Sequence, residues 1–356
     1  MPKLKLKAYF KTPSDIKVGV IGYGGAFNMG RSHLTEMKRA GMTPFAVCEL
    51  DPERLKVATE DFPGIETYAG LDAMLKHSGV NLLVHITPHN LHYPLAAKCV
   101  RAGKHVVTEK PFVVTTSEAD RLIALGQKHK VVVSTYHNRH WDGWITRAVR
   151  EIVEKKTIGE VYKVEAHAGS YGMPQDWWRT SRSISGGVLY DWGVHLLEYA
   201  LQVVDSDIVE VSGFAKEGHW AGLMKPRQPW KEDANEDEAT AIVRFANGTL
   251  LNLSVGQLRS DPKPFHLGFY GTGGAYEIQM YDKWTTRRPD RKGELVEKTG
   301  KHPASKGHLY YQNVADHLTG KAELVITPQW ARRPIHILDL AGRSAKARRA
   351  LRAKYT

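Results

Sequence analysis

Cysteine is scarce in this sequence of 356 residues: only Cys48 and Cys99 occur, both in apolar stretches and neither in a C-x-x-C pair. This scarcity excludes a disulfide scaffold and a dithiol redox motif, and it predicts buried, reduced thiols in a cytoplasmic protein. No apolar run approaches the about 20 residues that span a bilayer. The lysine-containing start lacks the apolar core and small-residue cleavage site of a signal peptide. We therefore expect neither export nor a membrane partner.

Acidic residues are outnumbered, 38 against 50 basic residues, which gives a formal net charge of +12. Much of the excess lies near the two ends, in Lys3, Lys5, Lys7 and Lys11 and in residues 343–354. These charges have no interleaved aromatic residues and no DNA-reading motif, so we expect a solvated surface and no nucleic-acid partner. Attraction of an anionic substrate is the alternative interpretation.

The first part of the chain alternates short apolar runs with helical segments. Predicted strands lie at 17–21, 43–48, 81–87, 105–108 and 131–136. Glycines near the ends of the intervening helices predict left-handed caps at Gly41, Gly64, Gly79, Gly103 and Gly126. Helices that separate short buried strands indicate βαβ units. We predict a parallel sheet in a dinucleotide-binding domain of residues 1–139.

The second part of the chain contains longer alternating runs. Predicted strands lie at 160–168, 208–216, 238–246, 249–258 and 265–271. Asn247-Gly248 is a strong signal for a two-residue hairpin. Residues 281–307 are polar and poorly periodic, which predicts a long loop, and helical patterns follow at 308–319 and 329–352. We predict an α+β domain of residues 140–356, mostly antiparallel, whose last helix is free to pack back on the first domain.

A glycine turn follows the first predicted strand, with Gly22, Gly24, Gly25 and then Gly30 before a helical segment. Glycine lets the chain turn tightly and approach a pyrophosphate, which then lies at a helix N-terminus. A plain turn between strand and helix is the alternative. Ala26, Phe27 and Asn28 separate Gly25 from Met29-Gly30 and lengthen the turn, and Phe27 packs either over the cofactor or on the sheet.

Glu49 ends the second predicted strand, near the position of the acid that binds ribose hydroxyls in dinucleotide sites. A carboxylate there repels a 2′-phosphate, which favours NAD over NADP. Asp51-Pro52 is a helix-start signal, so Asp51 is expected to cap the next helix. Arg54 is expected to be exposed on that helix.

Two further motifs contain residues suited to oxidation of an alcohol. Glu109-Lys110-Pro111 ends a predicted strand, where ligands of open α/β sheets bind, and a lysine can stabilise developing oxyanion charge. Asp191 and His195, in GGVLYDWGVH at 186–195, are four residues apart and share one face of a helix. The histidine suits proton transfer near neutrality. A capping aspartate and a core histidine are the alternative interpretation.

Together these motifs resemble the Gfo/Idh/MocA family of NAD(P)-dependent oxidoreductases. The resemblance covers nearly the whole chain. Besides the glycines, it includes Thr87-Pro88 with Asn90 and His92, AGKHVVTEKP at 102–111, NRHWDGW at 138–144 and GGVLYDWGVH at 186–195.

The family resemblance implies an α/β fold, with a Rossmann domain followed by a domain with an open, mostly antiparallel sheet. It implies that Lys110 polarises the reacting oxygen, that His195 is the general acid or base, and that Asp191 positions substrate and histidine. It also implies that Thr87, Pro88, Asn90, His92 and Glu109 line the cofactor. The complete predicted site for NAD, which Glu49 favours over NADP, adds Gly22, Gly24, Gly25, Ala26, Phe27, Glu49 and Lys110.

Other residues are candidates for the substrate site. Aromatic faces stack on sugar rings and arginine binds polyol oxygens or a carboxylate, so Trp178 and Arg179 are candidates. The alternative is that both residues only pack within a loop. Further candidates are Asn138, Arg139 and His167. No cysteine or carboxylate completes a metal site with His85, His89 and His92, so no metal is expected. The open sheet is expected to pair subunits into a homodimer or homotetramer.

Three functions fit these residues. The first is an NAD-dependent oxidoreductase that interconverts a secondary alcohol and a ketone on a sugar, cyclitol or related polyol. The second recycles NAD and cleaves a glycoside by oxidation and elimination. The third is a non-catalytic NAD or sugar sensor, which loss of the lysine or histidine would have favoured.

Overall fold

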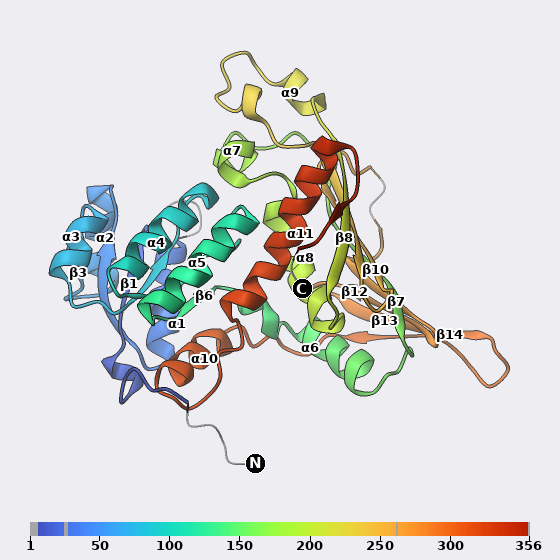
Figure 1. Cartoon of the computed structure of the whole chain (residues 1–356), viewed down its shortest axis with the longest axis horizontal. Coiled ribbons are helices and arrows are strands. Elements are labelled where there is room, and N and C mark those ends of the chain that lie inside the picture. The colour runs from blue at the N-terminus through green and yellow to red at the C-terminus, as the bar shows by residue number, and fades with distance from the viewer. Residues whose placement is uncertain (1–5, 25–27, 261–262, 355–356) are drawn as a thin grey trace. The chain divides into compact units, whose positions relative to one another are not determined.

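The computed structural model describes residues 6–24, 28–260 and 263–354. These residues form two compact units, drawn in Figure 1. The first unit comprises the described residues up to Asn138 together with His308–Arg332. The second comprises Arg139–Gly307 together with the described residues from Arg333 onward. The division after Asn138 falls beside the predicted boundary, but residues 308–332, expected in the second domain, group with the first unit.

A six-stranded parallel sheet lies at the centre of the first unit (Figure 1). Its order is β3-β2-β1-β4-β5-β6. The strands are β1 (Lys17–Ile21), β2 (Thr43–Cys48), β3 (Glu66–Tyr68), β4 (Leu82–His85), β5 (His105–Thr108) and β6 (Val133–Thr135). The strand order runs outward from β1 to β3 on one side and from β4 to β6 on the other, so it reverses between β1 and β4. Ligands of such sheets bind at the carboxyl ends of the strands beside this switch point.

Helices accompany these strands, and those that begin at Met29, Pro52 and Thr116 have a side-chain cap. They are α1 (Met29–Arg39), α2 (Pro52–Asp61), α3 (Leu71–His77), α4 (His92–Arg101), α5 (Thr116–His129) and, from the later segment, α10 (Leu309–Leu318). The Asp51 carboxylate accepts a hydrogen bond from the Glu53 N–H, which confirms the predicted cap of α2. Gly41, Gly64 and Gly103 have positive φ, but Gly79 and Gly126 do not. Gly126 lies inside α5, which ends at His129 and has Lys130 as its left-handed cap at φ 55°.

A nine-stranded sheet forms the second unit, in the order β14-β13-β12-β11-β7-β10-β9-β8-β15. Its central strands are β7 (Val161–Gly169), β8 (Ile208–Lys216), β9 (Glu238–Phe245), β10 (Leu250–Gly256), β11 (Leu267–Gly271) and β12 (Gly274–Gln279), with a short edge strand β15 (Leu351–Arg352). All neighbours are antiparallel except β7 and β10. The predicted fold class, a parallel Rossmann sheet followed by a mostly antiparallel sheet, is confirmed.

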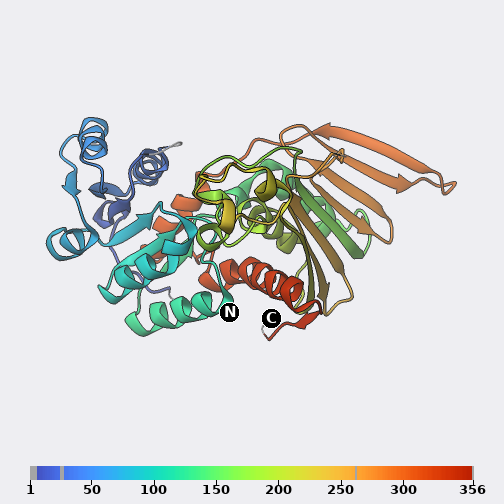
Figure 2. The ribbon, with the colours of Figure 1, turned by 90° about the horizontal axis from the view of Figure 1, so that it is seen from above.

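Two long helices, α8 (Leu189–Val203) and α11 (Pro328–Ala347), cover one face of this sheet (Figure 2). The covered face is apolar: Ala166, Ala241 and Leu253 lie in one cross-strand row and are buried. Gly213 continues the row, and a Cβ there would lie 1.9 Å from the Ala341 carbonyl oxygen of α11. Glycine therefore allows helix and strand to approach this closely. No helix in the described part of the chain is long and apolar enough to cross a bilayer.

The predicted loop at 281–307 is wrong over most of its length. It contains β13 (Lys283–Pro289) and β14 (Leu295–Lys301), which form a hairpin at the sheet edge (Figures 1 and 2). Nearly every residue of β14 is exposed, so the strand shows no polar and apolar alternation. Cross-strand ion pairs stabilise it instead: Arg287 lies 2.7 Å from Glu277 and 2.9 Å from Glu297. The hairpin predicted at Asn247-Gly248 is confirmed between β9 and β10.

Candidate active site

The glycine turn leaves β1 at the carboxyl edge of the parallel sheet. Gly22 and Gly24 have φ of 97° and 129°, a region that side chains disfavour. A Cβ on Gly22 would lie 2.4 Å from the Ile86 carbonyl oxygen, and one on Gly30 would lie 2.8 Å from the Gly22 carbonyl oxygen. Only glycine allows this compact turn into α1, as the nucleotide-binding interpretation requires.

Gly25, Ala26 and Phe27, all predicted cofactor residues, lie outside the described residues. Asn28, the next residue, caps α1: its backbone is left-handed, with φ 39°, and its side chain accepts from the Arg31 N–H. A Cβ on Gly30 would lie 2.8 Å from the Gly22 carbonyl oxygen, so the start of α1 lies beside the end of β1, and a helix N-terminus favours a phosphate.

Glu49 ties the end of β2 to the glycine turn. Its carboxylate accepts hydrogen bonds from the backbone N–H groups of Tyr23 (2.7 Å), Leu50 (2.7 Å) and Asp51 (3.1 Å). Arg54, expected to be simply exposed, is 44% exposed and also lies against this turn, because a Cβ on Gly24 would be 2.6 Å from its Cδ. An acid and a cation thus both lie at the carboxyl end of β2, where the sequence predicts the ribose.

The segment after β4 contains the second group of predicted cofactor residues. The Thr87 hydroxyl oxygen is buried and has no hydrogen-bond partner among the described residues. Pro88 and the exposed Asn90 lie in the following turn, η2 (His89–Leu91). His92 is fully buried and its Nδ1 and Nε2 lie 2.6 Å from the Pro111 and 3.1 Å from the Thr87 carbonyl oxygens. His92 therefore contacts the backbone on both sides, and its contact with the cofactor stays a prediction.

The Glu109-Lys110-Pro111 motif follows β5, and its Lys110–Pro111 peptide bond is cis. Glu109 Oε2 accepts a hydrogen bond from the Lys110 N–H at 2.8 Å, while Glu109 Oε1 lies 3.0 Å from His33 Nε2. His33 Nδ1 lies 2.6 Å from the hydroxyl of Tyr311 on α10. The sequence reasoning missed His33 and Tyr311; the available signal was a histidine on the apolar face of α1.

These features fit a dinucleotide. Glycines allow the close backbone turn at the end of β1, α1 begins beside it, and the buried Thr87 hydroxyl lacks a partner among the described residues that a bound ligand would supply. The residues that would hold the group are Gly22, Gly24, Glu49 and Thr87.

In the second unit, the Gly186-Gly187 pair sets the start of α8. Both glycines have positive φ, 92° and 125°. A Cβ on Gly187 would lie 2.9 Å from Glu236 Oε2, the oxygen that accepts a hydrogen bond from the Val188 N–H at 3.0 Å. The pair is thus required for the turn that places Asp191 and His195 on successive turns of α8.

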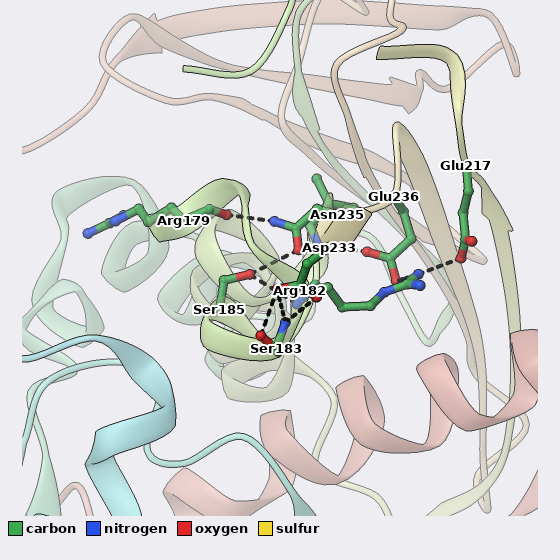
Figure 3. A network of polar contacts seen from close by, with 10 residues as sticks. Arg179, Arg182, Ser183, Ser185, Glu217, Asp233, Asn235 and Glu236 are labelled. Atoms are coloured by element: carbon green, nitrogen blue, oxygen red, sulfur yellow. Dashed lines mark hydrogen bonds and ion pairs between the residues drawn. The ribbon is translucent and has the colours of Figure 1, made fainter. Parts of the chain in front are cut away.

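Arg179 binds the Asp191 carboxylate, with 2.6 Å between Nη1 and Oδ1. The guanidinium carbon lies 5.0 Å and 5.1 Å from the ring centres of Trp177 and Trp178. Its backbone is fixed as well, because the Asn235 side chain donates to the Arg179 carbonyl oxygen at 2.6 Å (Figure 3). Asp191 is therefore held by an arginine that is itself supported on several sides.

A wider polar network holds this loop against residues 233–236 (Figure 3). Arg182 bridges Glu217 and Glu236. Asp233 accepts hydrogen bonds from both the N–H and the hydroxyl of Ser183, and Ser185 donates to Asn235. The residues next to the candidate catalytic helix are therefore positioned by side chains on a second segment.

Arg139 also lies beside α8. Its guanidinium carbon is 5.5 Å from the ring centre of Trp192, and its Nη1 donates to the Tyr281 hydroxyl at 2.9 Å. The Trp192 ring in turn lies 5.7 Å from that of His195. The second unit therefore gathers the predicted residues Arg139, Trp178, Arg179, Asp191 and His195 around the first turns of α8.

Asn138 and His167 are two further substrate candidates, and His85, His89 and His92 are a histidine set in which no metal is expected. Asn138 begins the turn η3 (Asn138–Trp141) at the end of the first unit. His167 lies on the sheet face opposite α8, where Nε2 is 2.6 Å from the Phe265 carbonyl oxygen. Burial lowers the His167 pKa to about 4. The rings of His85, His89 and His92 lie side by side, but no metal-binding group of three or more residues occurs in the described ranges.

Comparison with known proteins identifies both parts of the chain. Residues 16–137 match the model for the oxidoreductase family with an NAD-binding Rossmann fold, and residues 146–277 match the GFO/IDH/MocA C-terminal domain. The chain belongs to the Gfo/Idh/MocA oxidoreductase family. The resemblance drawn from the sequence motifs is therefore confirmed, and the chain is an oxidoreductase of an NAD(P)-binding family.

Relatives match this Gfo/Idh/MocA chain over nearly its whole length. It is 24% identical to the scyllo-inositol 2-dehydrogenase (NADP(+)) IolW of Bacillus subtilis, covering 94% of this chain and 95% of the relative. It is 28% identical to the uncharacterised oxidoreductase YdgJ of Escherichia coli, covering 95% and 98%. The WlbA dehydrogenase of Chromobacterium violaceum, solved with NADH and UDP-GlcNAcA, shares the fold at 19% identity, with a TM-score of 0.77 and 98% of each chain covered.

Proposed function

We propose that this protein is an NAD-dependent oxidoreductase that interconverts a secondary alcohol and a ketone on a sugar, cyclitol or related polyol. The observation that carries the proposal is the pair on α8: Asp191 and His195 lie one turn apart, and Arg179 holds the Asp191 carboxylate at 2.6 Å. The name of the inositol dehydrogenase relative supports this substrate class.

Each residue has one role in the proposed reaction. His195 takes the hydroxyl proton during oxidation and returns it during reduction. Lys110 donates a hydrogen bond to the reacting oxygen and stabilises its negative charge, and Asp191 binds the substrate and orients His195. The nicotinamide, when bound, exchanges the hydride. Trp178, Arg179 and Arg139 contribute ring-stacking and hydrogen-bonding groups for the polyol.

The test is NADH absorbance on incubation with NAD and a panel of sugars and cyclitols. Lys110→Ala and His195→Ala should each lower kcat by about 10²- to 10⁴-fold. Matched changes at exposed Lys76 and His77 should leave kcat unchanged. Full turnover by both active-site variants would overturn the roles. Release of an aglycone without net NADH would identify the glycoside-cleaving alternative, and NAD binding with no turnover across the panel would identify a sensor.

We propose NAD rather than NADP because the Glu49 carboxylate lies at the ribose-binding end of β2, where it disfavours a 2′-phosphate. Arg54 beside Gly24 is the competing feature. The ratio of kcat/KM for NAD over NADP measures the choice, and Glu49→Gln should lower that ratio about 10-fold or more. Glu53→Gln, at an exposed position on α2, is the control. A native preference for NADP would refute this assignment.

We also propose that the protein is a cytoplasmic homodimer or homotetramer paired through the second sheet. The face opposite α8 carries apolar side chains: Phe214 is 58% exposed, Leu250 is 40% exposed and Ile242 is 38% exposed. Cys48 and Cys99 are free, and burial raises their pKa values to about 11 and about 12, which suits unreactive thiols in a reducing compartment. Light scattering of the native protein and of Phe214→Glu tests the interface, because a monomeric native protein contradicts it.

A further inference from the structure

The Glu109-Lys110-Pro111 turn is contacted by two buried histidines. Glu109, just before the lysine, lies 3.0 Å from Nε2 of His33 on α1. Pro111, just after it, has its carbonyl oxygen 2.6 Å from Nδ1 of His92 on α4. Both histidines have 0% exposed surface. Lys110, at the centre of the turn, therefore lies between two residues that each contact a buried histidine.

The hydrogen atoms on the His33 side can be assigned from the chemistry. Burial alone would raise the pKa of Glu109, but the hydrogen bond and charge of His33, together with the Lys110 charge and N–H, lower it below its ordinary value. An ionised carboxylate only accepts hydrogen bonds, so His33 Nε2 is the donor. His33 Nδ1 lies 2.6 Å from the Tyr311 hydroxyl, which can donate or accept a hydrogen bond. A chain of bonds thus runs from Tyr311 through His33 to Glu109, which accepts from the Lys110 N–H.

On the other side, His92 uses its other nitrogen. The Pro111 carbonyl oxygen accepts hydrogen bonds only, and its 2.6 Å distance is the shorter of the two His92 contacts. Nδ1 is therefore the donor. The two histidines thus hold the turn through different ring nitrogens, Nε2 for His33 and Nδ1 for His92.

We propose that His33 and His92 are positioning residues that fix the Lys110 backbone for catalysis, a role that rests on the proposed function of Lys110. Displacement of a reacting group by about 1 Å lowers the rate about 10²-fold. Two buried side chains that prevent such a displacement of Lys110 would therefore preserve the rate. Neither histidine needs to touch the substrate for this role.

The use of different nitrogens allows a crossed test. Glutamine places its amide N–H near the position of histidine Nε2, and asparagine places its own near Nδ1. His33→Gln should therefore retain most of kcat while His33→Asn loses about 10- to 100-fold. For His92 the order reverses: asparagine is tolerated and glutamine is not. The loss should fall on kcat more than on KM for the polyol.

His105 is the matched control because it is buried at the start of β5, the strand that leads to Lys110. Its Nδ1 accepts from the Val132 N–H at 2.9 Å, away from the turn. His105→Gln and His105→Asn should leave kcat near the native value at pH 8. A packing role alone would rank glutamine and asparagine in the same order at positions 33 and 92, and that result would overturn the proposal.

Amide hydrogen exchange separates this proposal from the proposed function. His33→Asn and His92→Gln should speed exchange of the Glu109, Lys110 and Phe112 amides relative to the native protein and the His105 variants. If exchange is faster but the protein turns over no polyol, the dehydrogenase function is refuted, while the contacts that position the turn are supported. Unchanged exchange and kcat in an active enzyme would refute the positioning role itself.

Discussion

Arg179 and Asp191 form an ion pair of 2.6 Å on the second unit, with the guanidinium beside two tryptophan rings. The pair joins the loop before α8 to the first turn of that helix. Because Arg179 Nε is buried and has no partner among the described residues, the same guanidinium has a donor left for a polyol oxygen.

Arg179→Gln should therefore weaken the enzyme in two ways. Asp191 loses its orienting partner, and the substrate loses a donor, so kcat/KM for the polyol should fall about 10- to 100-fold while KM for NAD stays within about 2-fold. Steady-state kinetics with each substrate varied in turn gives both values. Arg227→Gln, at an exposed position of the same unit, is the control. An equal rise in both KM values would contradict a role at the polyol site.

The Thr87 hydroxyl provides a second prediction, because a buried hydroxyl without a partner contributes nothing favourable to the fold. Thr87→Val should leave the free energy of unfolding unchanged or slightly higher, yet raise KM for NAD about 2- to 10-fold by removing a ligand contact. Urea unfolding without cofactor and kinetics with it measure the two effects.

Thr108→Val is the matched control for this change. The Thr108 hydroxyl is hydrogen-bonded to that of Thr135 at 2.8 Å within the sheet, so its loss should lower the free energy of unfolding by about 1–3 kcal/mol. If Thr87→Val destabilised the protein as much and left KM for NAD unchanged, the hydroxyl would have a structural role.

How far the sequence predicted these features depends on whether a local signal existed. Buried strands such as 17–21 and 105–108 carry continuous β-branched runs, and their bounds agree with β1 and β5. β3 has three residues, and β14 is exposed along most of its length, so neither offers a pattern. The catalytic candidates were found through short motifs, whereas His33 and Tyr311 meet only after the chain folds, 278 positions apart.

Gly187 shows how strictly the start of α8 depends on glycine. Gly187→Ala places a Cβ 2.9 Å from Glu236 Oε2 at a φ of 125°, so it should lower the free energy of unfolding by about 1–3 kcal/mol. It should also lower kcat, because the altered turn positions Asp191, which lies four residues after Gly187. Gly172→Ala, with no atom within 4 Å of the added Cβ, should change stability by less than about 0.5 kcal/mol. Equal melting curves for the two variants would refute this view of the turn.

Buried histidines should make the fold sensitive to mild acid. Burial lowers the pKa of His167 and of His105 to about 4, whereas the unfolded chain has a value near 6.5. Between these values the unfolded state binds more protons than the folded state, so the free energy of unfolding falls as the pH drops from about 6.5 towards 4. Each histidine contributes up to about 1.4 kcal/mol per pH unit, and neither contributes to the slope above pH 7.

Urea unfolding at a series of pH values measures this slope. His167→Gln removes one of the two titrating rings, so its stability should fall less steeply than that of the native protein between pH 6.5 and 4.5, whatever its stability at pH 8. His77→Gln, at an exposed position on α3, should leave the slope unchanged. If His167→Gln had the native slope, the ring would be protonated equally in both states, and its short contact with the Phe265 carbonyl oxygen would belong to a charged imidazole.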